Sequence, residues 1–246
     1  NESTITRTWS LTDECNNTTT LVQTINVVDT TAPTFTAPAD LTIECDVDAT
    51  DLSITGDVTD EADNCSSGLE ATYTDTVAAG SCANESTITR TWSLTDECNN
   101  TITLVQTINV VDTTPPTLTV PADITIECTE DESSANTGVA TATDTCGSVT
   151  ITESDVETAA CGNTKTIVRT WTATDQCGNT TSGTQTITTE DTTPPTIDDS
   201  GVQNIDIQCG VTPDGTLEAW LANNAGATAS DTCGTVTWSN DFGSNT

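Results

Sequence analysis

The sequence of 246 residues contains no histidine and no methionine, and its only basic residues are Arg7, Arg90, Lys165 and Arg169. Without histidine the chain cannot form the Ser-His or Cys-His pairs that activate most enzyme nucleophiles. No glycine-rich phosphate loop follows a strand pattern either. We therefore expect no catalytic residues and no enzyme activity.

Positive charge is nearly missing, because 38 acidic residues leave a net charge of −34. Such a chain repels phosphate backbones and anionic membrane surfaces, which excludes nucleic acid as a partner. No apolar run approaches the roughly 20 residues of a membrane-spanning helix, so we expect no membrane insertion. An export signal or anchor is expected to lie outside this sequence.

Eleven cysteines are present, and none is arranged in the Cys-x-x-Cys pairs that are typical of cysteine-only zinc sites. They therefore indicate disulfides, which form in oxidising compartments. We expect an extracellular location, at the cell surface or in a secreted filament. Intrinsic disorder is the alternative for so acidic a chain, but regular cysteines and alternating apolar positions favour a folded one.

The chain is a tandem array. Residues 84–112 repeat residues 1–29 with one change, from Thr19 to Ile102, and a diverged copy follows at residues 163–191. Pro-containing joints separate the copies. We predict four parts: the C-terminal half of a repeat (1–29), two whole repeats (30–112 and 113–191), and the N-terminal part of another (192–246).

Alternation of apolar and polar residues predicts the fold of each repeat. In the strand expected over residues 87–95, Ile88, Trp92 and Leu94 share one face with Arg90. Each repeat offers six or seven such short strands, expected to be antiparallel, with one core Trp. The prediction is an all-β fold of tandem immunoglobulin-like β-sandwich domains in a linear array. Residues 216–224 have helical spacing and predict one short helix.

Several motifs recur at the same places in the repeats: a Asp-Thr-Thr-Pro-Pro joint, an Ile-Glu-Cys strand end, an Ala-Thr-Asp-x-Cys-Gly corner and a Thr-Trp-x-x-Thr-Asp-x-Cys-Gly-Asn stretch. Together with the Leu-Glu-Ala-Trp-Leu insert, they resemble the hyalin-repeat-like (HYR-like), immunoglobulin-like repeats of very large secreted adhesins of Bacteroidota, including gliding-motility adhesins. The resemblance implies a surface adhesin exported by the type IX system.

The direction of the predicted strands suggests which cysteines can pair. Cys161 and Cys177 bracket a strand of about ten residues, roughly 30 Å long, which is too far for a disulfide. Pairing at the same end of each sandwich predicts Cys45–Cys82, Cys65–Cys98, Cys128–Cys161 and Cys146–Cys177. Sequential pairing of Cys128 with Cys146 is the alternative.

Aspartates recur at the joints, where the same loop geometry would bring them together. Carboxylates that converge are costly unless a cation lies among them, and oxygen ligands suit Ca²⁺. We predict calcium sites formed by Asp29, Asp63 and Asp96, by Asp112, Asp144 and Asp175, and by Asp191, Asp231 and Asp13 of a neighbouring copy. The alternative is that these residues only cap turns through hydrogen bonds.

Two further patterns concern single residues. Arg7, Arg90 and Arg169 each precede a Trp by two positions, which predicts a structural guanidinium that stacks on indole and pairs with a carboxylate. Asp-Thr pairs followed by small or apolar residues resemble the O-glycosylation pattern of Bacteroidota at Thr30, Thr76, Thr113 and Thr192. The abundance of Thr is the competing explanation.

The predicted function is a structural stalk or filament segment of an extracellular bacterial adhesin, stapled by disulfides and made rigid by calcium. The alternative is a carbohydrate- or protein-binding module that uses Trp220 and Trp238, which depart from the repeated pattern. The predicted partners are further repeats or neighbouring copies, with residues 192–246 of one copy completed by residues 1–29 of the next. Cys233 would then bond Cys15 of that neighbour, and Cys209 would have no partner in its own copy.

Overall fold

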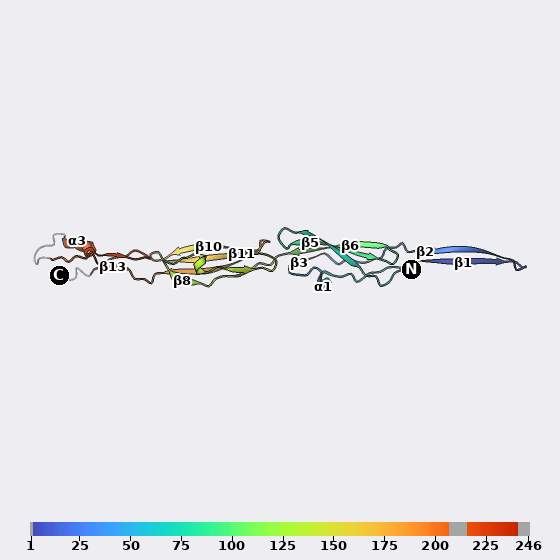
Figure 1. Ribbon diagram of the computed structural model, residues 1–246, viewed down its shortest axis with the longest axis horizontal. Helices are drawn as coiled ribbons and strands as arrows, with labels where there is room; N and C mark the ends of the chain where they lie inside the picture. The colour runs from blue at the N-terminus through green and yellow to red at the C-terminus, as the bar shows by residue number, and fades with distance from the viewer. Residues whose placement is uncertain (1, 207–215, 241–246) are drawn as a thin grey trace. The chain divides into compact units, whose positions relative to one another are not determined.

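A computed structural model describes residues 2–206 and 216–240. The chain forms two compact units. The first comprises Asn1–Pro115, Asp144–Ser148 and Asp175–Asn179, and the second comprises Pro116–Thr143, Val149–Thr174 and Thr180–Thr246. Both consist mainly of β-strands (Figure 1), which confirms the predicted all-β class. The domain boundaries inferred from the repeats stay a prediction.

The first unit contains a four-stranded sheet in the order β3-β6-β5-β4 and a separate hairpin, β1–β2. Its elements are β1 (Ser3–Thr12), β2 (Thr18–Val27), β3 (Leu41–Glu44), α1 (Leu52–Thr55), β4 (Thr72–Ala79), β5 (Ser86–Thr95) and β6 (Thr101–Val111). β3 runs parallel to β6. This parallel pair differs from the all-antiparallel arrangement expected from the sequence, because β3 pairs with β6, the last strand of its repeat, rather than with the strand that follows it in the chain.

Strand β5 shows why the sheet forms. Ile88, Arg90, Trp92 and Leu94 are all buried along it, while the intervening Thr and Ser residues are partly exposed. The segments around Phe35 and Val58 form the second layer and pack against Trp92 and Leu94. The repeat is therefore a two-layered β-sandwich, as the alternation predicted.

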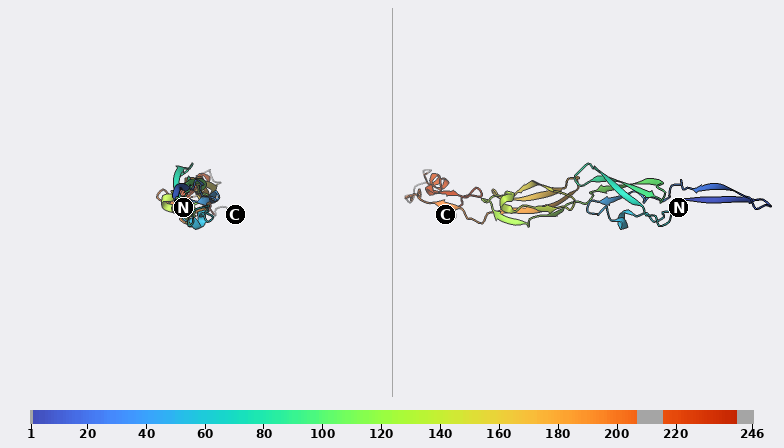
Figure 2. Two further views of the ribbon diagram at one scale, coloured as in Figure 1. Left: turned by 90° about the vertical axis from the view of Figure 1, so that its right-hand side faces the viewer. Right: turned by 45° about the vertical axis from the view of Figure 1, so that its right-hand side comes forward.

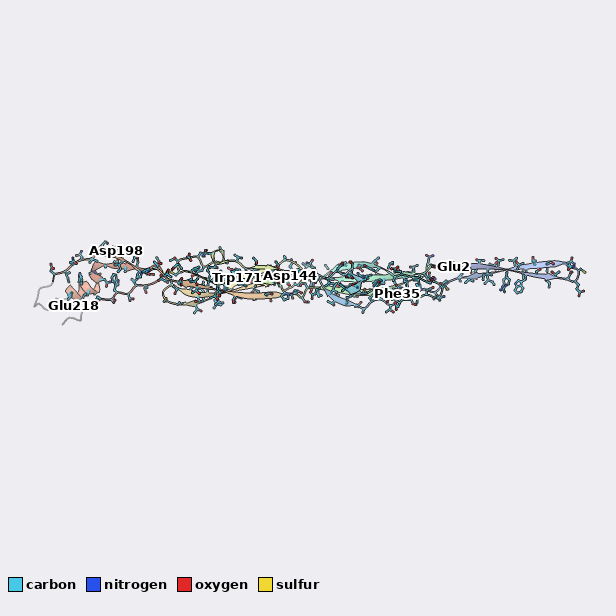
Figure 3. All side chains as sticks on the ribbon, turned by 90° about the horizontal axis from the view of Figure 1, so that it is seen from below. Glu2, Phe35, Asp144, Trp171, Asp198 and Glu218 are labelled. Carbon is cyan, nitrogen blue, oxygen red and sulfur yellow. A yellow bond between two sulfur atoms is a disulfide. The ribbon has the colours of Figure 1, made fainter. Side chains whose placement is uncertain are left out.

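The hairpin β1–β2 has nearly the sequence of β5–β6 and the same register, since Trp9 faces Leu21 as Trp92 faces Leu104. No second layer covers this hairpin among the described residues (Figure 2). Its side chains project from both faces (Figure 3). Trp9 is consequently 54% exposed, whereas Trp92 is fully buried.

The second unit repeats the sandwich with a sheet in the order β10-β11-β12-β8 and a small sheet of β7 and β9. Its elements are β7 (Thr117–Thr119), β8 (Ile124–Glu127), α2 (Ser134–Thr137), β9 (Thr141–Thr143), β10 (Thr150–Ala159), β11 (Lys165–Thr174) and β12 (Thr180–Glu190). β8 is parallel to β12. Ile126, Ile167 and Ile187 form one buried cluster, and Trp171 is also buried.

The last part of this unit contains less regular structure. Its elements are β13 (Thr196–Asp198), α3 (Thr216–Ala222), the 3₁₀ turn η1 (Asn224–Gly226) and β14 (Thr228–Ser230). The α3 helix confirms the short helix predicted from apolar spacing. Cys209, which was expected to have no partner in its own copy, lies outside the described residues.

Candidate functional site

The loop between β5 and β6 is organised by one aspartate. The Asp96 carboxylate accepts hydrogen bonds from the backbone N–H groups of Cys98 and Asn100, both at 2.8 Å, and from the Asn100 amide at 2.7 Å. Asn99 turns the chain with a left-handed φ of 67°, a conformation that asparagine tolerates better than most residues. The Asp-x-Cys-x-Asn spacing thus forms a hydrogen-bonded turn, which is the capping role that was weighed against metal binding.

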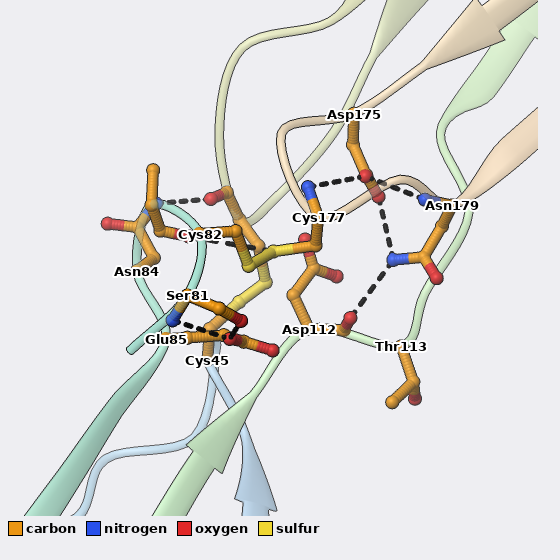
Figure 4. The surroundings of a disulfide bond; sticks show 12 residues. Cys45, Ser81, Cys82, Asn84, Glu85, Asp112, Thr113, Asp175, Cys177 and Asn179 are labelled. Carbon is orange, nitrogen blue, oxygen red and sulfur yellow. Dashed lines mark hydrogen bonds between the residues drawn. A yellow bond between two sulfur atoms is a disulfide. The ribbon is translucent and has the colours of Figure 1, made fainter. Parts of the chain in front are cut away.

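The same turn recurs at Asp13 and at Asp175, where the carboxylate accepts from the equivalent Cys and Asn. The turn's asparagine also holds the preceding joint: the Asn100 amide donates to the Asp29 carbonyl at 3.2 Å, and the Asn179 amide donates to the Asp112 carbonyl at 3.0 Å (Figure 4). The turns at Asp96 and Asp175 therefore fasten the end of the preceding repeat.

The structure brings Asp29, Asp63 and Asp96 together, as the sequence predicted. One carboxylate oxygen from each lies within 4.8 Å of the others. Asp29 and Asp96 are only 7% and 5% exposed. We name this group the first acidic junction.

Two buried oxygens of the first acidic junction, Asp29 Oδ2 and Asp63 Oδ1, have no hydrogen-bond partner within the described parts of the chain. Backbone hydrogen bonds from Cys65 and Ser66 lower the pKa of Asp63, so this group is ionised at neutral pH. Buried carboxylate oxygens without partners are costly. The arrangement can hold a hard cation such as Ca²⁺ in this first junction.

At Asp112 the predicted calcium site stays a prediction. Burial, assisted by the charges of Asp144, Asp175 and Glu44, raises the pKa of Asp112. Its carboxylate also lies beside the sulfurs of Cys45 and Cys146, with one ligand atom from each residue within 4.8 Å of the others. These sulfurs are bonded to each other, and a disulfide carries no charge with which to bind a metal. Asp144 and Asp175 also cap their own loops, as Asp63 and Asp96 do.

The third predicted calcium site needs Asp13 of a neighbouring copy and stays a prediction. Asp191 is exposed and lies near Glu127 and the bonded sulfur of Cys233. Asp231 accepts from the Cys233 N–H at 2.7 Å, while Asp13 is exposed and caps its own turn.

The sequence reasoning overlooked Glu44 and Glu127. The Glu44 carboxylate accepts hydrogen bonds from the N–H and the hydroxyl of Thr113, and Glu127 holds Thr192 in the same way. The Ile-Glu-Cys strand end was the available signal. The four predicted glycosylation residues, Thr30, Thr76, Thr113 and Thr192, are all exposed, and their modification stays a prediction.

Among the described residues, three disulfides join cysteines of successive repeats. Cys45 bonds Cys146, Cys82 bonds Cys177 and Cys128 bonds Cys233, with Cα–Cα distances of 5.9, 5.1 and 5.9 Å. The partners are 101, 95 and 105 positions apart in the sequence. The first two bonds lie in the first unit and the third lies in the second unit.

These bonds correct the predicted pairs Cys45–Cys82, Cys128–Cys161 and Cys146–Cys177, and also the alternative Cys128–Cys146. No disulfide joins Cys65 to Cys98 in the described chain, where both cysteines make other contacts. Cys233 bonds Cys128 of its own chain rather than Cys15 of a neighbour. Cys15 and Cys161 are exposed thiols.

Strand topology explains the error. Because β3 is parallel to β6, the Cys45 N–H donates to the Val111 carbonyl at 2.9 Å. Cys45 therefore lies where the chain leaves its repeat. Cys82 lies at the same end, since it precedes β5, whose Ser86 pairs with Val110. The prediction placed Cys45 and Cys82 correctly at the same end of the sandwich. Their disulfide partners at this end, however, come from loops of the following repeat.

The two whole repeats share a buried arginine network. Arg90 is fully buried. Its guanidinium donates to both carboxylate oxygens of Asp75 at 2.9 Å and to the Thr55 hydroxyl at 2.9 Å, and it lies 6.0 Å from the Trp92 ring centre. Arg169 repeats this with Asp155 and Thr137. The geometry agrees with the structural role that was predicted.

Among the described residues, none of the helices has the length and apolar character needed to cross a lipid bilayer. One pocket is lined by both unusual tryptophans, Trp220 and Trp238, together with Leu221, Asn224, Ala225, Ser239 and Asn240.

Comparison with known proteins finds similar solved structures and one matching family model. No curated protein matches the chain in sequence. Similar solved structures include protocadherin gammaB7 EC3-6, at 13% identity and a TM-score of 0.33, with 81% of this chain and 61% of that chain covered. Human CDH23 EC21-23 is similar at 14% identity and a TM-score of 0.31, with 74% and 77% covered.

The chain thus spans less than two thirds of the protocadherin chain. Residues 33–110 match the model of the HYR-like domain with 4 cysteines, and these residues fall within the predicted repeat 30–112.

Proposed function

We propose that this chain is a structural stalk or filament segment of an extracellular bacterial adhesin, built from HYR-like repeats. The observation that carries the proposal is the disulfide pairing between successive repeats, Cys45–Cys146 and Cys82–Cys177. A protein that must span a distance benefits from repeats that cannot separate. Disulfides also favour an oxidising extracellular compartment. The resemblance to Bacteroidota adhesin repeats supports a bacterial source.

The proposal includes no catalysis. The aspartates of the described junctions cap turns, and they lie at repeated positions. Carboxylates at repeated junctions are poor candidates for a single catalytic cleft, and the sequence has no histidine to act as a general base near neutral pH.

A binding experiment tests the stalk. Beads coated with the chain are presented to glycan and protein arrays, and retention is measured under flow. If the chain is a stalk, retention of the coated beads stays at the background level for every ligand on the arrays. Saturable binding to one ligand, abolished by one surface substitution, would overturn this function.

The pocket between Trp220 and Trp238 favours a carbohydrate-binding module as the second candidate. Indole faces and amides are the groups that contact sugar rings in many binding sites, and Trp238 is 41% exposed. In the same array, this alternative expects glycan retention that Trp238→Ala removes. Val105→Asp, on the exposed face of β6, serves as the matched control.

Calcium is proposed for the first acidic junction, on the strength of its two buried oxygens without partners. Calcium should raise the thermal midpoint of the chain, because an ion that binds only the folded state stabilises it. Asp63→Asn should abolish the shift. Asp13→Asn should leave it intact, because Asp13 lies outside this group. An identical calcium response in all three proteins would exclude the site.

Further repeats or neighbouring copies are the proposed partners. The β1–β2 hairpin exposes Trp9 and Leu11, whose equivalents Trp92 and Leu94 are fully buried. An apolar face of this kind favours association. We expect concentration-dependent self-association in sedimentation experiments, weakened by Trp9→Asp and unaffected by Val105→Asp. A chain that stays monomeric at every concentration would exclude copies as partners.

A further inference from the structure

The three disulfides overlap along the sequence. The loop from Cys45 to Cys146 contains Cys82 and Cys128, so each later bond begins before the previous loop has closed. Disulfides within single repeats would form loops that do not extend from one repeat into the next. Overlapping loops instead create a covalent route that bypasses most of the chain.

The shortest covalent route from Cys45 to Cys233 uses two of the three bonds. It crosses from Cys45 to Cys146, follows the chain back to Cys128, and crosses to Cys233. Cys128 and Cys146 are only 18 positions apart, whereas 188 positions separate Cys45 from Cys233. When the chain ends are pulled apart, the tension between Cys45 and Cys233 is therefore carried only by the residues from Cys128 to Cys146 and by the two disulfides.

Backbone geometry converts this route into a length. An extended residue spans at most about 3.3–3.6 Å, so the oxidised chain between Cys45 and Cys233 can reach roughly 75 Å and the reduced chain roughly 650 Å. This limit is covalent. It holds whether the repeats are folded or unfolded.

We propose that the disulfides between repeats act as an extension limiter, which keeps the protein short under tension even after its sandwiches unfold. This inference rests on the proposed stalk function. Hydrogen bonds and burial resist the first unfolding step, but they cannot limit the length of a chain that has already unfolded. The disulfide-bonded cysteines do limit that length.

A second series of cysteines follows the same rule. Cys82 bonds Cys177, and Cys161 lies 16 positions before Cys177 with an exposed thiol. Cys161 occupies in its repeat the place that Cys82 occupies in the previous one. A following repeat would continue this series from Cys161, so two covalent routes would run in parallel.

Single-molecule stretching of the full chain tests the limiter. The termini are attached through cysteine-free peptide tags, and the maximal contour length is measured with and without reductant. The oxidised protein should reach about 270 Å and the reduced protein about 860 Å, roughly a threefold difference, from the route length at 3.3–3.6 Å per residue.

Two double variants separate the routes. Cys45→Ser with Cys146→Ser removes one bond of the shortest route and should lengthen the oxidised chain to about 500 Å, counted over the residues that then bear tension. Cys82→Ser with Cys177→Ser removes a bond that this route does not use. This matched control should keep the wild-type length, and a non-reducing peptide map establishes the remaining bonds.

Contour length does not depend on folding stability, so a weakened fold does not obscure the result. An oxidised wild-type length near 600 Å, which pairing within repeats would give at the same length per residue, overturns the limiter. Equal lengthening of both double variants also overturns it. A ligand found on the arrays would refute the stalk but leave the measured length unchanged, so the two failures are distinguishable.

Discussion

The buried arginines show most directly how single residues hold a repeat together. Arg169 donates to the Asp155 carboxylate, to the Thr137 hydroxyl and to the Glu132 carbonyl at 2.8–3.0 Å. A planar guanidinium satisfies these acceptors at once. Its removal leaves all three without their donor.

We therefore expect Arg169→Met to lower the free energy of unfolding by about 2–4 kcal/mol, since truncating one partner of a buried ion pair leaves the other unpaired. Urea denaturation measures this loss. Arg7→Met is the control, because Arg7 also precedes a Trp by two positions but lies on the exposed hairpin, and it should cost less than about 0.5 kcal/mol. Equal costs at both positions would contradict the network.

The partner carboxylate makes this contribution depend on pH. Hydrogen bonds from Arg169 lower the pKa of Asp155 against the opposing effect of burial. The ionised form therefore stabilises the fold above the pKa of an unfolded aspartate, about 3.9, and this stability is lost as pH falls through the lower folded value. Asp155→Asn should destabilise near neutral pH and cost progressively less below about pH 4. Denaturation at several pH values measures it, and a constant cost would refute the assignment.

How far single residues could be predicted depends on how local their contacts are. The arginine beside Trp and the turn-capping aspartates follow from short spacings, and Asp29, Asp63 and Asp96 were grouped correctly. The Cys45–Cys146 bond beside the Asp112 carboxylate was not predicted. A bond to a cysteine 101 positions away has no local signal.

At the scale of elements, the one-turn helices depend on a glycine. Gly138 ends α2 with a φ of 106°, and a Cβ built there would lie 2.9 Å from Cβ of Pro121. Gly138→Ala combines backbone strain with this clash, so we expect a loss of about 1–3 kcal/mol in unfolding free energy. Thermal denaturation tests it.

Gly147→Ala is the comparison, because its nearest contact is the flexible Gln176 amide at 3.0 Å and its φ lies outside the left-handed region. It should cost clearly less. The reverse order of the two costs would contradict the role of Gly138.

The long strands were predictable and the short elements were not. Alternation predicted a strand over residues 87–95, and β5 covers Ser86–Thr95. The four residues of α1 are too few for helical periodicity to be detected, although Asp51 caps them. The parallel pairing of β3 with β6 depends on how the chain crosses between layers, and alternation alone does not specify that path.

At the scale of the whole molecule, charge opposes folding. The net charge of −34 brings like charges closer together in the folded chain than in the unfolded one. Raising NaCl from about 0.01 to 0.3 M shortens the Debye length from about 30 Å to less than 10 Å. We expect the thermal midpoint to rise by several degrees over this range. A midpoint that falls would show that the few ion pairs outweigh the repulsion.

The near-identity of residues 1–29 and 84–112 also affects how the chain folds. During synthesis, residues 30–83 appear after the first hairpin and before the second. Trp9 and Arg7 then offer this segment the same side chains as Trp92 and Arg90, and Thr19 in place of Ile102 is the only sequence difference. Early pairing with the wrong hairpin is a kinetic trap created by repetition itself, and each newly made repeat must compete with its predecessor for the segment between them.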